Sequence, residues 1–94
     1  LVGEPRADLT DCIVVVEDDA LLQDGVRAVA MLQNGGLSAE LLAAGSPRKR
    51  FDKAVKQAPR AILALSLAEG AIRQRFHGSE EDEGLVRAIV AGNA

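Results

Sequence analysis

The chain has 94 residues, of which 48% are hydrophobic and only 2% aromatic, and its formal net charge is −3. This length suits one small domain whose core is built from aliphatic side chains. A single cysteine, Cys12, excludes an internal disulfide and favours a reduced, cytoplasmic setting. The apolar runs are shorter than the ~20 residues that span a bilayer, so we expect no membrane association and no signal peptide.

The first part of the chain predicts a strand followed by a helix. Residues 1–11 are polar and aperiodic, and we interpret them as a linker or an entry strand. The apolar, β-branched run over residues 12–16 predicts a buried strand. Apolar side chains at helical spacing then predict a helix as far as residue 33, with Asp18 or Asp19 as its cap.

The middle of the chain predicts two further strands around a second helix. Residues 37–42 have the pattern of a strand. Ser46 can cap a helix, and Pro47 suits the first helical position, so the second helix is expected over residues 47–57. Pro59 then breaks the helix, and the apolar run over residues 61–65 predicts another buried strand.

The last part predicts a half-exposed strand and a final helix. Side chains alternate over residues 71–76, and the short connection before them implies a hairpin. Ser79 can cap a helix over residues 80–91, whose acidic first turn suits the helix dipole. The whole order predicts an α/β domain over residues 12–94: three layers, α/β/α, around a mixed, mostly parallel sheet with an antiparallel edge strand.

Positive charge is concentrated in one short segment. Residues 48–60 carry six basic side chains and one acid, whereas residues 1–47 carry two basic side chains and eight acids. A cationic helix in an otherwise acidic domain can position a phosphate backbone. The alternative is a solvated basic face on which Arg48 pairs with Asp52 at helical spacing. The candidate binding residues of this helix are Arg48, Lys49, Arg50, Lys53 and Lys56.

The stretch IVVVEDD, which ends at Asp19, raises the question of a metal site. Phosphoacceptor receiver domains open in a similar way, but they also need an aspartate after a later central strand and a lysine after the last strand. Here that strand ends in Ser66-Leu-Ala, and no lysine follows Lys56. We therefore interpret the acids as a helix start, expect no metal site, and keep a degenerate receiver-like domain as an alternative. His77 is the only histidine, and Cys12 reads as a buried thiol, so we expect no active site in this chain.

Three stretches carry a resemblance to a known family. They are Gly36-Leu-Ser-Ala-Glu-Leu-Leu42, Ser46-Pro-Arg-Lys-Arg-Phe-Asp-Lys-Ala54 and Pro59-Arg-Ala-Ile-Leu-Ala-Leu65. In order and spacing they resemble the C-terminal anticodon-binding domain of class II aminoacyl-tRNA synthetases, most closely that of histidyl-tRNA synthetases. The resemblance covers about residues 12–76. The sequence begins with Leu1 rather than an initiator methionine, and its only methionine is Met31. We therefore also expect the domain to come from a longer protein.

The resemblance implies that the partner is the anticodon stem-loop of a tRNA, held by the basic helix. It adds Glu69, as the acid of the turn after the third strand, and Arg73 and Arg75, as the basic residues of the fourth. Aromatic side chains are scarce, so stacking on bases would fall to these arginines. The full-length enzyme would be a homodimer that joins histidine to tRNA with ATP and Mg²⁺, in a catalytic domain absent here. A regulatory or dimerisation domain of a synthetase paralogue stays open as an alternative.

Overall fold

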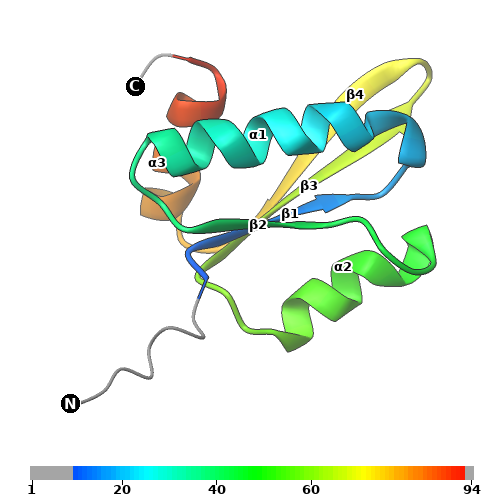
Figure 1. Ribbon diagram of the computed structural model, residues 1–94, viewed down its shortest axis with the longest axis horizontal. Coiled ribbons are helices and arrows are strands. Elements are labelled where there is room, and N and C mark those ends of the chain that lie inside the picture. The colour runs from blue at the N-terminus through cyan, green and yellow to red at the C-terminus, as the bar shows by residue number, and fades with distance from the viewer. Residues whose placement is uncertain (1–9, 93–94) are drawn as a thin grey trace.

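The structure is a computed structural model that describes residues 10–92 (Figure 1). The predicted order of helices and strands is confirmed, whereas the predicted linker or entry strand over residues 1–11 lies, apart from its last two residues, outside the described residues. None of the helices in the described part has the length and apolar character needed to cross a membrane. The elements are β1 (Cys12–Val16), a 3₁₀ turn η2 (Asp19–Leu21), α1 (Leu22–Asn34), β2 (Ala39–Leu42), α2 (Pro47–Lys56), β3 (Ala61–Ala68), β4 (Ala71–His77) and α3 (Glu80–Val90).

The four strands form one sheet in the order β2-β1-β3-β4. β1 runs parallel to both β2 and β3, whereas β4 is antiparallel to β3 and lies at one edge. Helices α1 and α3 cover one face of this sheet, and α2 covers the other (Figure 1). The predicted three-layer fold, with a mostly parallel sheet and an antiparallel edge strand, is therefore confirmed.

The two faces of the sheet have unequal cores. Every residue of β1 is buried, which explains its uninterrupted apolar sequence. On the face of α1 and α3, a large cluster includes Val14, Leu32 and Leu63. On the face of α2, the cluster is smaller, and Ala54 is the one fully buried apolar residue that this helix contributes. Helix α2 is therefore attached by few apolar contacts.

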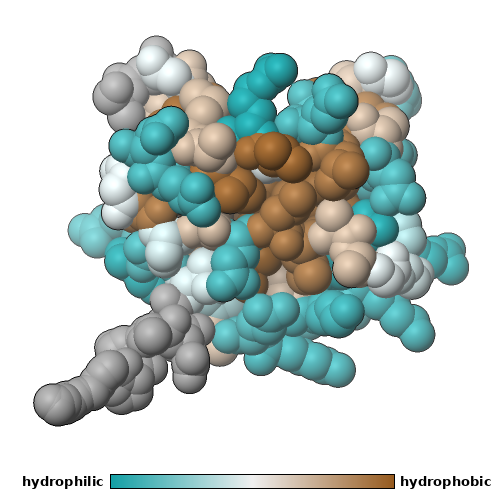
Figure 2. Space-filling view, viewed as in Figure 1, coloured by the Kyte–Doolittle hydropathy of each residue, from teal (hydrophilic) through white to brown (hydrophobic). Residues whose placement is uncertain are grey.

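An apolar surface lies along the edge of the sheet that is formed by β2 (Figure 2). Leu22 and Val26 on α1 are 45% and 51% exposed. They lie on the flank of α1 that faces β2, because a Cβ atom placed on Gly25, between them in sequence, would lie 2.9 Å from the Leu41 side chain of β2. Figure 2 shows this apolar surface over β2 and the adjoining part of α1, with hydrophilic side chains around it.

The helix starts confirm two of the predicted caps and contradict the third. The Asp18 carboxylate accepts a hydrogen bond from the Ala20 amide at 2.9 Å, and the Ser79 hydroxyl accepts one from the Asp82 amide at 3.1 Å. The predicted Ser46 cap is wrong, since that hydroxyl makes no capping bond to α2. The start of α2 is instead held through the carbonyl of Gly45, which accepts hydrogen bonds from the Arg50 guanidinium.

The two serines give a direct test of these helix starts. We expect Ser79→Ala to lower the free energy of unfolding by about 1 kcal/mol, because one amide at the start of α3 loses its acceptor. Ser46→Ala should leave stability within about 0.5 kcal/mol of wild type. Urea denaturation followed by circular dichroism measures both. Equal effects from the two substitutions would contradict the described caps.

Candidate nucleic-acid interface

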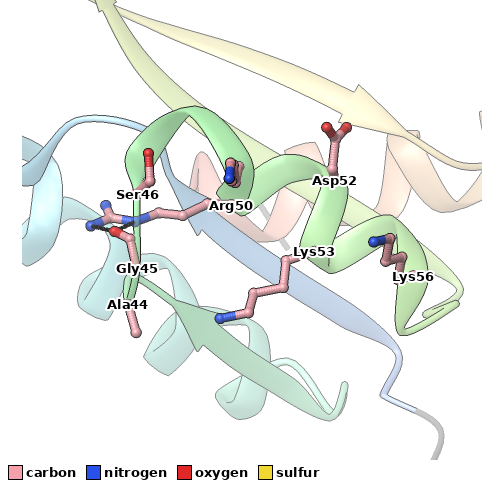
Figure 3. Close-up of a pocket in the computed structure, with 8 residues that line it drawn as sticks. Ala44, Gly45, Ser46, Arg50, Asp52, Lys53 and Lys56 are labelled. Carbon is pink, nitrogen blue, oxygen red and sulfur yellow. Dashed lines mark hydrogen bonds between the residues drawn. The ribbon is translucent and has the colours of Figure 1, made fainter.

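The lysines of α2 line an open groove beside the loop that leads from β2 into the helix. The groove has a volume of about 460 Å³, and Figure 3 shows Lys53 extending from α2 toward Ala44 at its far side. The start of α2, with its positive helix dipole, lies at the same groove. The residues that line it are Ala44, Gly45, Ser46, Lys49, Arg50, Asp52, Lys53 and Lys56.

These lysines keep their charge available to a ligand. Within residues 10–92, the ion pairs involve only the arginines at positions 50, 60, 75 and 87. The alternative pairing of Arg48 with Asp52 is therefore not formed in this part of the chain. Asp52 also lines the groove, but within the described residues it forms no ion pair with Lys49, Lys53 or Lys56. The three ammonium groups therefore outnumber the single carboxylate, and the groove presents a cationic surface on which phosphate oxygens can be bound.

Arg50 lies inside the protein rather than on the cationic surface where the sequence analysis placed it. Its side chain is 4% exposed, and it donates hydrogen bonds to the carbonyls of Val16 at 2.7 Å and Gly45 at 3.0 Å. It also forms an ion pair with Asp19 at 3.0 Å. One guanidinium thus joins the end of β1, the turn η2, the β2–α2 loop and α2. The helical spacing to Ala54, one turn later on the buried face, could have revealed that Arg50 faces the core, although not which groups it reaches there.

Arg75 is a residue of β4, and its side chain contacts α2 on the side of the helix away from the lysine groove. Its guanidinium stands over the Phe51 ring, 4.0 Å from the ring centroid, and donates to the Glu17 carboxylate at 3.1 Å. The same Phe51 ring meets His77 edge to face, with 6.1 Å between the ring centroids. Because β4 and β2 are opposite edges of the sheet, Arg75 and the lysine groove are separate sites.

The remaining two candidate residues also belong to the β4 side. Arg73 pairs in register with Ser66 of β3 and lies two residues before Arg75 in β4. Glu69 lies at the tip of the β3–β4 hairpin and has a φ of 54°. The predicted hairpin is confirmed, but the predicted end of the third strand at residue 65 is wrong, because residues 66–68 continue β3 and only Glu69 and Gly70 form the turn. The proposed binding residues thus divide into a lysine group near β2 and a group on β4.

The acids after β1 have separate contacts. Glu17 pairs with Arg75, Asp18 caps η2, and Asp19 pairs with Arg50. Within residues 10–92, no group of three or more His, Cys, Asp or Glu side chains is arranged to hold a metal ion. The interpretation of the acids as a helix start therefore holds for Asp18, whereas Glu17 and Asp19 are held in ion pairs with arginines of β4 and α2.

The cysteine is confirmed as a buried thiol. Cys12 is fully enclosed in the core, and burial raises its pKa to about 11. Because the reactive form of a cysteine is the thiolate, this side chain is largely protonated and inert near neutral pH.

Comparison with known proteins places the chain beside one enzyme. No protein-family model matches the sequence, and no solved structure matches it. A histidine–tRNA ligase from Novosphingobium aromaticivorans is 54% identical over 81 residues. The matched region is 86% of this chain but 19% of the ligase, so the chain spans about a fifth of that enzyme's length. The chain is therefore related in sequence to one segment of a histidine–tRNA ligase.

Proposed function

We propose that this chain is the tRNA anticodon-binding domain of a histidyl-tRNA synthetase or a close relative. The observation that carries the proposal is the groove of unpaired lysines on α2, in a chain of net charge −3 that is related to a histidine–tRNA ligase. A groove of this kind favours a polyanion, while the acidic remainder of the domain disfavours binding elsewhere.

The lysines act on the RNA backbone rather than on its sequence. Lys49, Lys53 and Lys56 lie within two turns of one helix, so successive phosphates of a strand can follow them. Each ammonium group is a mobile point charge without the planar geometry that bidentate recognition needs. The groove therefore positions the stem-loop, and base recognition falls to other side chains.

The catalytic chemistry belongs to the remainder of the longer protein. We propose that the full-length enzyme joins histidine to its tRNA with ATP and Mg²⁺, as a homodimer. The segment of the histidine–tRNA ligase that matches this chain is 19% of that enzyme. This chain then supplies affinity and orientation for the tRNA, and it needs no cofactor of its own.

A triple substitution tests the groove. We expect Lys49→Ala, Lys53→Ala and Lys56→Ala together to weaken binding of an anticodon stem-loop RNA by about 10-fold or more at ~0.1 M salt. The plot of log affinity against log salt concentration should also become shallower by about 2, since three phosphate contacts are removed. Fluorescence anisotropy over a series of salt concentrations measures both quantities.

The matched control removes positive charge from the other face of the sheet. Arg27→Ala with Arg87→Ala changes α1 and α3 and leaves the groove intact, so binding should stay within about threefold of wild type. Unchanged affinity and an unchanged salt slope in the lysine variant would contradict the proposal that this groove holds RNA.

The apolar surface at the open edge of the sheet favours a second candidate function, a regulatory or dimerisation domain. Leu22 and Val26 are exposed beside β2 (Figure 2), and an apolar patch next to an open strand suits a protein partner. Sedimentation of the chain over a range of concentrations distinguishes this candidate, because dimerisation would raise the apparent mass and Val26→Glu would reverse it.

A further inference from the structure

We infer that the guanidinium of Arg75 is a stacking surface for an unpaired nucleobase, on the β4 flank of α2 and apart from the lysine groove. The inference rests on the proposed function and deepens it. It assigns backbone binding and base binding to different sides of the same helix.

The contacts of Arg75 hold its guanidinium in one orientation. The guanidinium carbon lies 4.0 Å from the centroid of the Phe51 ring, and the Glu17 carboxylate accepts a hydrogen bond from the guanidinium at 3.1 Å. Glu17 is itself fixed, because its backbone amide donates to the carbonyl of Leu65 at 2.8 Å. The Arg75 side chain is nevertheless 59% exposed, so much of it is open to solvent on the side away from Phe51. A flat cation already held in place loses little conformational freedom when a ring stacks on it.

These contacts favour a base over a phosphate. The Glu17 carboxylate partly neutralises the charge of Arg75, which weakens its attraction for an anion. Stacking depends instead on the planar π face, which the ion pair leaves unchanged. Arg73 lacks both features, because no ion pair or cation–π contact of the described residues involves it. Arg75 is thus the arginine of β4 suited to a base.

The two sites lie close enough for one RNA strand to reach both. Phe51, which supports Arg75, and Lys53, which lines the groove, are two residues apart on α2 and therefore point to opposite flanks. The exposed Arg48 lies between these flanks. A single strand that crosses α2 can place its phosphates against the lysines and turn an unpaired base onto Arg75.

Arg75→Lys is the matched test, because it keeps the charge and removes the plane. The probe is a short single-stranded RNA that carries one 2-aminopurine, together with the same RNA made abasic at that position. We expect Arg75→Lys to weaken binding of the intact RNA by about 10-fold, with the salt slope unchanged. The abasic RNA should bind wild type and Arg75→Lys equally, and wild type should quench 2-aminopurine fluorescence more than the variant does.

A second measurement does not depend on the RNA backbone. Titration of the ¹⁵N-labelled chain with adenosine, which has no phosphate, should shift the Arg75 Nε–H resonance, and Phe51→Leu should reduce that shift. If wild type binds RNA in a salt-dependent way, while Arg75→Lys, the abasic change and adenosine have no effect, the stacking inference is overturned and the proposed function stands. If wild type binds no RNA, both are overturned.

Discussion

Replacing Arg50 by alanine is expected to lower the free energy of unfolding by about 3 kcal/mol. The guanidinium is 4% exposed, and its loss would leave the buried Val16 carbonyl without this donor and would release the Gly45 carbonyl at the start of α2. The ion pair with Asp19 contributes less, because that carboxylate is 80% exposed and screened by water. Thermal unfolding followed by circular dichroism should show a midpoint lowered by more than ~10 °C.

Two controls separate this internal role from simple loss of charge. Arg48→Ala removes an exposed arginine from the same helix, and its effect should be below about 0.5 kcal/mol. Arg50→Lys keeps the charge but cannot reproduce the forked hydrogen bonds, so a substantial part of the loss should persist. Similar, small effects from all three substitutions would show that Arg50 does not connect α2 to the end of β1.

Gly25→Ala is expected to destabilise the domain by about 2 kcal/mol, although alanine favours a helix over glycine by about 1 kcal/mol. A Cβ atom at position 25 would lie 2.4 Å from the Val16 Cγ2 atom and 2.9 Å from the Leu41 Cδ1 atom. Val16 is fully buried in β1 and cannot move away in a close-packed core. The glycine therefore allows α1 to lie directly on β1 and β2.

The same substitution elsewhere in the chain should have the opposite sign. Gly84 is in α3, and no atom lies within 4 Å of a Cβ placed there. Gly84→Ala should therefore stabilise the protein by about 0.5–1 kcal/mol, through helix propensity and the smaller entropy of the unfolded chain. Urea denaturation of both variants decides the question, and a gain in stability from Gly25→Ala would mean that α1 does not approach β1 so closely.

The fold could be predicted from the sequence because its strongest signals are local. The uninterrupted apolar run of β1 requires cover on both faces. The alternation in β4 predicted a strand covered on one face, but Phe76 is its one partly buried residue and Ile72 is 48% exposed. The end of β3 was missed because Ser66 and Ala68 are not typical strand residues. They are held in the strand by pairing with Arg73 and Ala71 across the hairpin, which no local pattern reveals.

The candidate site was predicted less completely, for a similar reason. The spacing of Lys49, Lys53 and Lys56 sufficed to place them together, because the period of one helix decides it. Helical spacing could not show that Arg50 reaches the end of β1 or that Arg75 lies over Phe51, since both contacts join segments far apart in sequence. The composition of the basic segment therefore indicated a cationic surface, whereas the burial of Arg50 and the separate position of Arg75 on β4 depended on the tertiary fold.

The light attachment of α2 has a consequence for how such domains diverge. This helix is anchored by one enclosed alanine, a half-buried ring and the inward-pointing Arg50, so its outer side chains carry almost none of the packing. Substitutions there can accumulate without disturbing the layers beneath. Related domains can in this way keep the same fold while the exposed side chains of α2 gain, change or lose the ability to bind a ligand.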